Sequence, residues 1–257
     1  MSRARTIVIA LVTVFLGDDL LQPPKARANS EVVETGRLLA ILLDAGRVTI
    51  GANQSLINDP ERGDKNFPPE VFEKQLIAKF KERANVDLVN LKTEKVPELA
   101  KKLLPALVDA EKQVVTDYQI VINKQGVGFK GFIPATFGTQ AAAKFRTKTG
   151  CPTAPTCVYL KQTMNPPRNP KNTPDEFEAR VLKAFADTSY PRQGEKIVSD
   201  TVDGGKAIRV MLPLFYLKGC LPCHGEPKGE KDISGYMKEG AKEGDLGGAI
   251  SVKIQLK

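Results

Sequence analysis

The chain has 257 residues and a formal net charge of +8, from 38 lysines and arginines against 30 aspartates and glutamates. The basic residues are scattered, with no dense basic run interleaved with aromatic residues, which argues against a nucleic-acid partner. A mildly basic surface is better suited to steering an acidic redox partner protein. The length is sufficient for a substantial core and long for one small domain, which predicts two units.

Residues 1–28 have the pattern of a secretory signal peptide. Two arginines precede an apolar run over residues 7–16, and Ala26-Arg27-Ala28 supplies a small-x-small cleavage pattern. The run is shorter than the roughly 20 residues that span a bilayer, although an uncleaved anchor is the competing interpretation. We therefore expect a mature chain that begins near Asn29, has no membrane span and lies in a bacterial periplasm.

A shift of 65 residues aligns the chain with itself. Between residues 38–80 and residues 103–145, 17 of 43 positions are identical. The shared glycine and proline lie in a loop, where helical periodicity does not create them, so the match indicates a duplication. Each copy predicts a long helix, a loop and a second helix that opens at a proline, Pro69 or Pro134.

The two copies are expected to end in short extended pieces, over residues 86–92 and 157–163. The first copy, residues 29–95, contains neither cysteine nor histidine. We therefore expect it to serve packing or partner contact and to be removable without loss of a cofactor. The second copy continues into the C-terminal region, so the cofactor-binding domain is expected over residues 96–257.

A helix and a sheet are expected after the second copy. Thr173 predicts an N-cap, with Pro174 at the first helical position and Glu176 three residues after the cap. A helix followed by strands predicts an α+β fold with a mostly antiparallel sheet. The expected strands are residues 195–202, 206–217 and 246–256, with a turn at residues 203–205.

The sequence GCLPCHGE, residues 219–226, contains the single histidine of the chain, His224, directly after Cys220 and Cys223. Random placement would produce Cys-x-x-Cys-His with a probability on the order of 10⁻⁴. Two cysteines at this spacing match the two vinyl groups of haem, and the adjacent histidine reaches the iron as an axial ligand. The motif therefore predicts one covalently bound haem c.

Two other interpretations of the motif are weaker. A redox dithiol belongs at a strand-to-helix junction, whereas loop-forming residues follow here. A zinc site would need two further ligands, which Cys151 and Cys157 could supply. Those two cysteines are better explained as a local disulfide in an oxidising compartment. The competing idea is a Cys157 thiolate bound to the haem iron.

The sequence does not determine which group occupies the sixth coordination position of the iron. A second histidine does not exist, so bis-histidine ligation within one chain is impossible. Arg168 is a candidate for a haem propionate contact, and bracing of the adjacent proline- and asparagine-rich turn is the alternative. The candidates for the sixth position are Met164, Met211, Met237, Cys151 and Cys157, or else an empty or water-bound position.

Three segments together resemble the PAS-like c-type haem family. They are RNPKNTPDEFE at residues 168–178, CLPCHG at residues 220–225 and GDLGGAISV at residues 244–252. The resemblance covers the chain from about Leu99 to the end, and the first copy repeats the front half of the family pattern. Members are exported cytochromes or extracytoplasmic sensor modules.

The resemblance implies a PAS-like fold, with an antiparallel sheet, helices on one side and a long N-terminal helix. It also implies Cys220 and Cys223 as haem attachments and His224 as the axial ligand. The chain has no cysteine between Asn29 and Gly150, which excludes a distal cysteine ligand from the N-terminal helices.

Two functions are therefore expected. The first is electron transfer by an exported monohaem cytochrome, and the alternative is a haem-based redox or gas sensor. An enzyme is not expected, because no second histidine or acid-base group accompanies the haem motif.

Overall fold

The computed structural model describes residues 24–153 and 156–256. Residues 1–23, most of the predicted signal peptide, lie outside the described residues, so that expectation stays a prediction. Helix α1 runs from Pro24 to Ala52 and includes the predicted cleavage pattern. Across the described ranges, no helix is both long and apolar enough to cross a membrane.

Helices form the first part of the chain, and a sheet with one long helix forms the second. After α1 the N-terminal elements are α2 (Gln54–Ile57), α3 (Pro69–Ala84), η2 (Leu91–Thr93), α4 (Glu98–Asp117), α5 (Gln119–Ile122) and α6 (Pro134–Lys148). The C-terminal elements are β1 (Val158–Thr163), η3 (Pro170–Asn172), α7 (Glu176–Ala186), β2 (Val198–Val202), η4 (Asp203–Gly205), β3 (Ala207–Phe215), η5 (Lys218–Cys220), α8 (Leu221–His224) and β4 (Leu246–Gln255).

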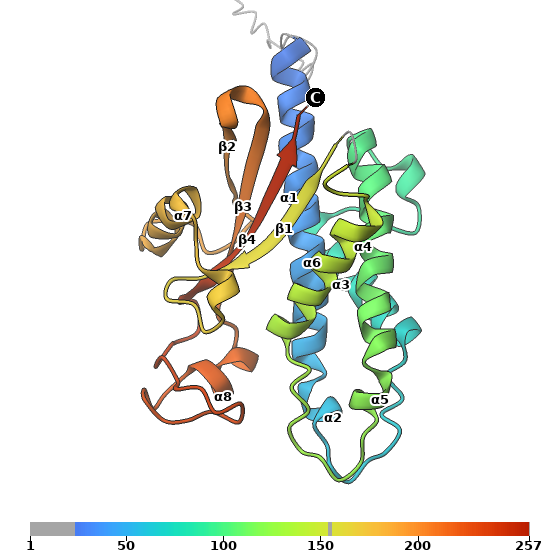
Figure 1. The fold of residues 1–257 in the computed structure, drawn as a ribbon, viewed down its shortest axis with the longest axis vertical. Helices are drawn as coiled ribbons and strands as arrows, with labels where there is room; N and C mark the ends of the chain where they lie inside the picture. The colour runs from blue at the N-terminus through green and yellow to red at the C-terminus, as the bar shows by residue number, and fades with distance from the viewer. Residues whose placement is uncertain (1–23, 154–155, 257) are drawn as a thin grey trace, which may run out of the picture.

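The four strands form one antiparallel sheet in the order β1-β4-β3-β2. Figure 1 shows α1 running the length of the molecule along this sheet, with α3, α4 and α6 beside it. The predicted α+β fold, with an antiparallel sheet and a long N-terminal helix, is confirmed.

Helices cover both faces of the sheet, whereas the family resemblance implied helices on one side. Successive residues of a strand point to opposite faces. In β3, Ile208, Val210 and Leu212 join the core formed with the N-terminal helices. Met211 instead packs with Phe185 of α7. The apolar stripe of α7 requires a buried surface of its own, and the second face of the sheet provides it.

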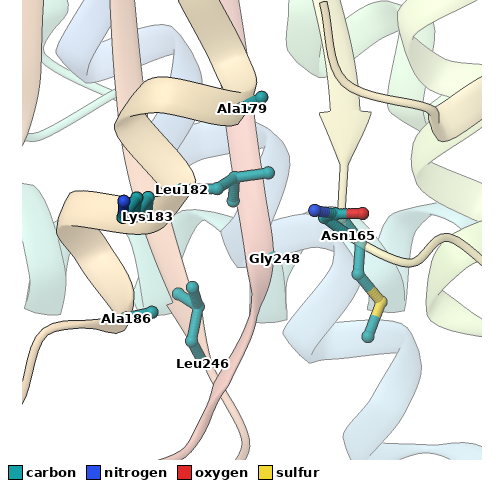
Figure 2. Close-up of a pocket in the computed structure, with 8 residues that line it drawn as sticks. Asn165, Ala179, Leu182, Lys183, Ala186, Leu246 and Gly248 are labelled. Atoms are coloured by element: carbon teal, nitrogen blue, oxygen red, sulfur yellow. The ribbon is translucent and has the colours of Figure 1, made fainter.

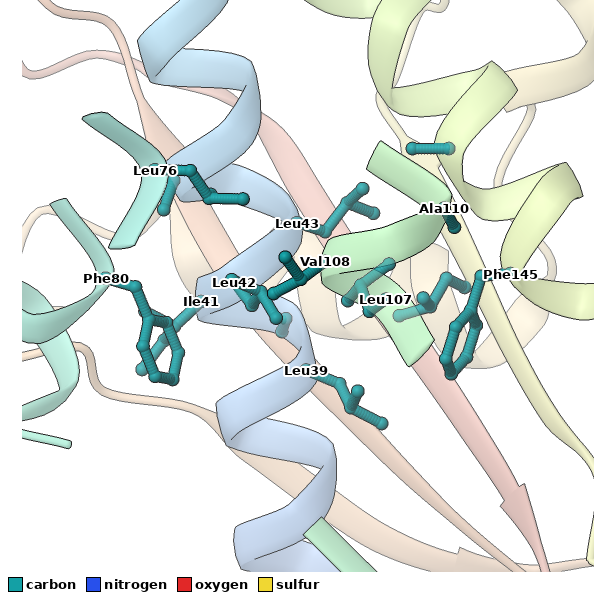
Figure 3. Packing of buried hydrophobic residues seen from close by; sticks show 14 of the residues in the cluster. Leu39, Ile41, Leu42, Leu43, Leu76, Phe80, Leu107, Val108, Ala110 and Phe145 are labelled. Atoms are coloured by element: carbon teal, nitrogen blue, oxygen red, sulfur yellow. The ribbon is translucent and has the colours of Figure 1, made fainter. Parts of the chain in front are cut away.

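The larger core lies between the N-terminal helices and continues onto the sheet. Figure 3 shows Leu42 on α1, with Leu76 and Phe80 of α3 on one side of that helix and Leu107 of α4 on the other. All four side chains are fully buried. Burial of a side chain of this size stabilises a fold by about 1.5–3 kcal/mol. The helices therefore form a packed layer that supports one face of the sheet.

Each copy of the repeat donates a side-chain hydrogen bond to a loop of the other copy. Gln54 Nε2 of the first copy donates to the Phe132 carbonyl of the second at 2.9 Å. Its counterpart Gln119 Nε2 donates to the Phe67 carbonyl at 3.1 Å. Reciprocal bonds between equivalent residues are what an approximate two-fold relation between the copies produces.

A second pair of contacts follows the same rule. The backbone amide of Lys65 donates to Asn123 Oδ1 at 3.0 Å. The amide of its counterpart Lys130 donates to Asn58 Oδ1 at 3.1 Å. The shared asparagines of the repeat are thus explained by contacts between the copies.

The first copy differs from expectation in two respects. Residues 86–92 form no strand and lead into η2, so the extended piece expected there is wrong. In addition, α1 packs directly on β3 and β4. A Cβ added to Gly36 would lie 2.7 Å from Val210 Cγ2. The domain boundary at residue 95 stays a prediction. Helix α1 packs against α3, which precedes this boundary, and also against β3 and β4, which follow it.

Helix α7 begins later than the sequence pattern predicts. Asp175 is the N-cap, and it forms a capping box with Glu178 through bonds of 2.8 and 3.1 Å. The hydroxyl of Thr173 instead donates to the Pro170 carbonyl at 2.7 Å. The predicted cap was wrong because Thr173 and Asp175 each have a glutamate three residues later, so the capping-box pattern fits both.

Candidate functional site

The Cys-x-x-Cys-His motif lies in a loop-rich lobe, residues 216–245, that connects β3 to β4 (Figure 1). The short helices η5 and α8 carry the motif in consecutive turns. The amide of Gly225 ends α8 by donating to the Leu221 carbonyl at 2.8 Å. A Cβ at Gly225 would lie 2.7 Å from that same oxygen, so the tight turn after the histidine requires glycine.

Cys220 and Cys223 are unpaired in the structure and partly exposed. Burial raises the pKa of the Cys223 thiol, and the nearby charge of Asp232 acts in the same direction. The two thiols and the imidazole of His224 come from one short segment. The lobe therefore presents three potential bonding groups together.

The imidazole of His224 is held on one edge. Its Nδ1 lies 2.9 Å from Glu239 Oε2 and 3.3 Å from the Tyr216 hydroxyl. The Tyr216 ring lies against the imidazole, with 4.8 Å between ring centroids. Burial lowers the pKa of His224, although the hydrogen bond to Glu239 acts in the opposite direction. The lowered pKa favours the neutral imidazole. Because a carboxylate accepts hydrogen bonds, Nδ1 carries the proton and Nε2 is left with its lone pair.

Arg168 connects the segment after β1 to this lobe. Its guanidinium donates to both carboxylate oxygens of Glu239 at 2.6 and 2.9 Å and to Asp232 at 2.7 Å. It also donates to the Cys223 carbonyl at 2.8 Å. Burial raises the pKa of Glu239, but the hydrogen bonds from Arg168 and His224 outweigh it and lower the pKa overall. Glu239 is therefore an ionised, fixed acceptor for the imidazole.

The structure thus brings Arg168 to the motif, where it braces the lobe itself. Its contact with a haem propionate stays a prediction. Sequence reasoning missed Glu239, Asp232 and Tyr216, because their contacts form across loops that leave no fixed spacing. The one available signal was chemical: a ligating histidine normally donates its other ring N–H to an acceptor, and the loop after the motif contains carboxylates.

Cys151 and Cys157 are joined in a disulfide, with their Cα atoms 5.3 Å apart. Sulfurs in a disulfide are not thiolates, so in this state neither cysteine is available to iron or zinc. The zinc interpretation thereby lacks the two further ligands that it required. Within the described part of the chain, no group of three or more His, Cys, Asp and Glu residues is arranged to hold a metal ion.

A pocket of about 350 Å³ lies between α7 and the ends of β1 and β4 (Figure 2). In Figure 2, Leu182 of α7 faces the strand end that carries Asn165. The pocket adjoins the lobe, because Leu246 follows Asp245, whose carbonyl accepts the Tyr216 amide at 2.9 Å. The lining residues are Met164, Asn165, Ala179, Leu182, Lys183, Ala186, Leu246 and Gly248.

The three methionines proposed for the sixth iron position occupy different environments. Met211 is fully buried between the sheet and α7. Met237 lies in the lobe and is 56% exposed. Met164 is partly buried and lines the pocket.

The chain is an α+β protein. Its four-stranded antiparallel sheet is packed between helices, and a lobe with a Cys-x-x-Cys-His motif lies between the two central strands. The Tll0287-like family matches residues 28–255, and the chain belongs to this family. The predicted family resemblance is thereby confirmed.

One solved structure that matches is the crystal structure of the cyanobacterial haem protein Tll0287. Its sequence is 18% identical, the match covers 62% of this chain and 96% of that chain, and the TM-score is 0.41. The curated proteins contain no match to the chain.

Proposed function

We propose that the chain is an exported monohaem c-type cytochrome that transfers electrons in the periplasm. The observation that carries the proposal is the His224–Glu239 hydrogen bond beside the two unpaired thiols. It fixes the imidazole with Nε2 free, as a ligating histidine requires. Membership of a family named after a haem protein supports the same cofactor.

Each residue of the motif has one role in this proposal. Cys220 and Cys223 would hold the haem through thioether bonds, in which each thiol would add across one vinyl group, with sulfur bonding one carbon and hydrogen the other. His224 would bind the iron through Nε2, while Glu239 holds the ring and Arg168 holds the loop in place. When bound, haem supplies one-electron chemistry between its ferric and ferrous states.

The local structure fits haem attachment better than a redox dithiol. In thioredoxin-like proteins the cysteine pair opens a helix within a βαβ unit. Here α8 contains four residues and ends at Gly225, and the strands on either side of the lobe are antiparallel. The segment is therefore a loop that carries both thiols and the histidine in consecutive turns.

The location and the partner belong to the same proposal. The N-terminal sequence pattern supports export, and export supports haem attachment outside the cytoplasm. The net positive charge, +6 once residues 1–28 are removed, supports an acidic redox partner, because opposite charges accelerate encounter. No enzymatic activity is proposed, since no acid-base group other than the hydrogen-bonded pair His224 and Glu239 is identified beside the motif.

A haem-based redox or gas sensor is the second candidate. The pocket of about 350 Å³ next to the lobe favours it, because a small ligand would have space there. Carbon monoxide distinguishes the two candidates. Rapid binding to the reduced protein would support the sensor, whereas fast electron exchange without binding would support the carrier.

Covalent haem attachment tests the proposal directly. Protein matured in a periplasm with haem-attachment machinery is expected to gain the mass of one haem, and acid-acetone is expected to leave the colour on the protein. Cys220→Ser and Cys223→Ser should each lose one thioether bond and weaken attachment. The double variant Cys151→Ser/Cys157→Ser is the control, because it removes cysteines outside the motif without leaving a free thiol, and it should keep its haem. A wild-type mass without haem would refute the proposal.

A further inference from the structure

We propose that the pocket between α7 and the ends of β1 and β4 binds a small monocarboxylate. The apolar part of this ligand lies against Leu182 and Leu246, and its carboxylate pairs with Lys183. The residues that line the pocket include none of the Cys-x-x-Cys-His motif, so the proposal goes beyond the proposed function and does not depend on it.

One face of α7 forms a wall of the pocket. Ala179, Leu182, Lys183 and Ala186 line it, and their spacing of three, four and seven residues places them along one side of a helix. The two alanines lie one turn before and one turn after the central pair, and both are exposed. Because their side chains are single methyl groups, the helix leaves a hollow there that is open to solvent.

The rest of the lining is mostly apolar. Leu182 belongs to the small apolar cluster under α7, and Leu246, at the start of β4, packs against the same cluster. In Figure 2, α7 lies on one side of the strand that carries Gly248, and Asn165 lies on the other. Apolar walls with a few polar side chains are typical of small-molecule sites. Here Asn165 and Lys183 are the polar side chains of the lining.

Lys183 determines which charge the ligand carries. It is the one charged side chain among the described residues that line the pocket, and none of the described residues forms an ion pair with it. Nearby cations are already paired, Lys161 with Glu178 and Arg180 with Asp200. A carboxylate supplies the missing partner, whereas a cationic ligand is repelled.

The volume of the pocket sets the size of the ligand. The cavity measures about 350 Å³. A water molecule occupies about 30 Å³ in the liquid, so the pocket has space for about ten non-hydrogen atoms. Octanoate is a monocarboxylate of this size. Octanol and octylamine have the same chain and differ in the charge of the head group, so the three ligands separate the apolar contribution from the ionic one.

Isothermal titration calorimetry of the full chain with these three ligands tests the proposal. We expect octanoate to bind more tightly than octanol, and octylamine not to bind. Lys183→Gln should weaken octanoate binding about tenfold and leave octanol binding unchanged, since it removes one charge-assisted hydrogen bond at an exposed position. Lys124→Gln is the matched control, because Lys124 is an exposed lysine after α5 and does not line the pocket.

A second variant tests the position of the site. Ala179→Leu keeps a good helix former in α7 and fills part of the hollow, so it should weaken the binding of both octanoate and octanol. Circular dichroism checks that each variant is folded. Lys183 also lies in the last turn of α7, where a cation stabilises the helix whatever the pocket contains. Ligand affinity, which that structural role does not change, is therefore the measurement.

Several results would overturn the proposal. One is the absence of octanoate binding at millimolar concentration, and another is equal affinity for octanoate and octanol in the wild type. Octanoate binding that is unchanged in folded Lys183→Gln and Ala179→Leu would place the ligand elsewhere. An equal loss in Lys124→Gln would show unspecific attraction to the basic surface. Each of these results would leave the proposed electron transfer intact.

Discussion

At the scale of single residues, Glu111 of α4 is a carboxyl group placed where water cannot reach it. Its side chain is fully buried, and neither oxygen has a hydrogen-bond partner among the described residues. It faces Gly46 of α1, where an added Cβ would overlap Glu111 Oε2. Burial raises the pKa of Glu111 well above its ordinary value of 4.5, and the charge of Asp44 adds to the effect.

This environment predicts how stability depends on pH. The unfolded chain loses the Glu111 proton near pH 4.5, whereas the folded chain keeps it to a higher pH. The folded state therefore binds more protons in this range, and stability falls as pH rises, by up to about 1.4 kcal/mol per pH unit. Glu111→Gln should flatten the dependence of the unfolding free energy on pH from roughly pH 5 to 7.

Glu98→Gln is the control, because the Glu98 side chain is 86% exposed and its replacement should leave the pH dependence unchanged. Denaturant unfolding across a pH series measures both variants. An equal pH dependence in wild type and Glu111→Gln would show that the buried carboxyl does not retain its proton.

Sequence reasoning identifies residues whose chemistry is marked by a motif, and it misses those that tertiary contacts create. Cys220, Cys223 and His224 have a fixed spacing, so they could be named before the structure. Glu239 reaches His224 from 15 residues along the chain. Glu111 lies in a helical pattern, and nothing in its neighbours along the chain indicates the missing partners.

At the scale of elements, two alanine variants at the start of α7 distinguish the two possible capping boxes. Asp175 caps the helix and also accepts a bond from Arg209 at 2.6 Å. Asp175→Ala should destabilise the fold by about 1–2 kcal/mol, since it removes both contacts. Thr173→Ala should cost less than about 0.5 kcal/mol, because its hydroxyl bonds only the exposed turn. Chemical denaturation compares them, and a larger loss in Thr173→Ala would restore the original sequence interpretation.

Elements with strong local patterns could be predicted, and those decided by distant contacts could not. Apolar runs and the turn at residues 203–205 located β2 and β3 correctly, because alternation and glycine are local signals. The piece at residues 86–92 has similar alternation but no neighbouring strand with which to pair. Its counterpart, β1, is a strand because β4 lies beside it.

At the scale of the whole molecule, the packing of α1 changes what is expected when the first copy is removed. The sequence suggested that a chain starting at Val96 keeps its haem. The structure shows α1 against β3 and β4, with Gly36 closely packed on Val210. Its removal would expose one face of the sheet, at a cost of about 25 cal/mol for each Å² of apolar surface.

We therefore expect the chain starting at Val96 to be insoluble or to unfold without cooperativity. A chain starting at Asn29 keeps most of α1 and serves as the control. Circular dichroism and thermal unfolding measure the fold, and the optical spectrum measures the haem. A truncated protein with cooperative unfolding and a wild-type spectrum would show that the helical layer is dispensable.

The reciprocal bonds between the copies have a consequence for how the helical layer assembles. Gln54 and Gln119 each close a loop that belongs to the other copy. Two separate chains making the same contacts would dissociate on dilution. A short covalent connection instead holds the partners at an effective concentration in the millimolar range, whatever the amount of protein in solution. The chain thereby keeps a paired helical layer at any dilution without needing a second molecule.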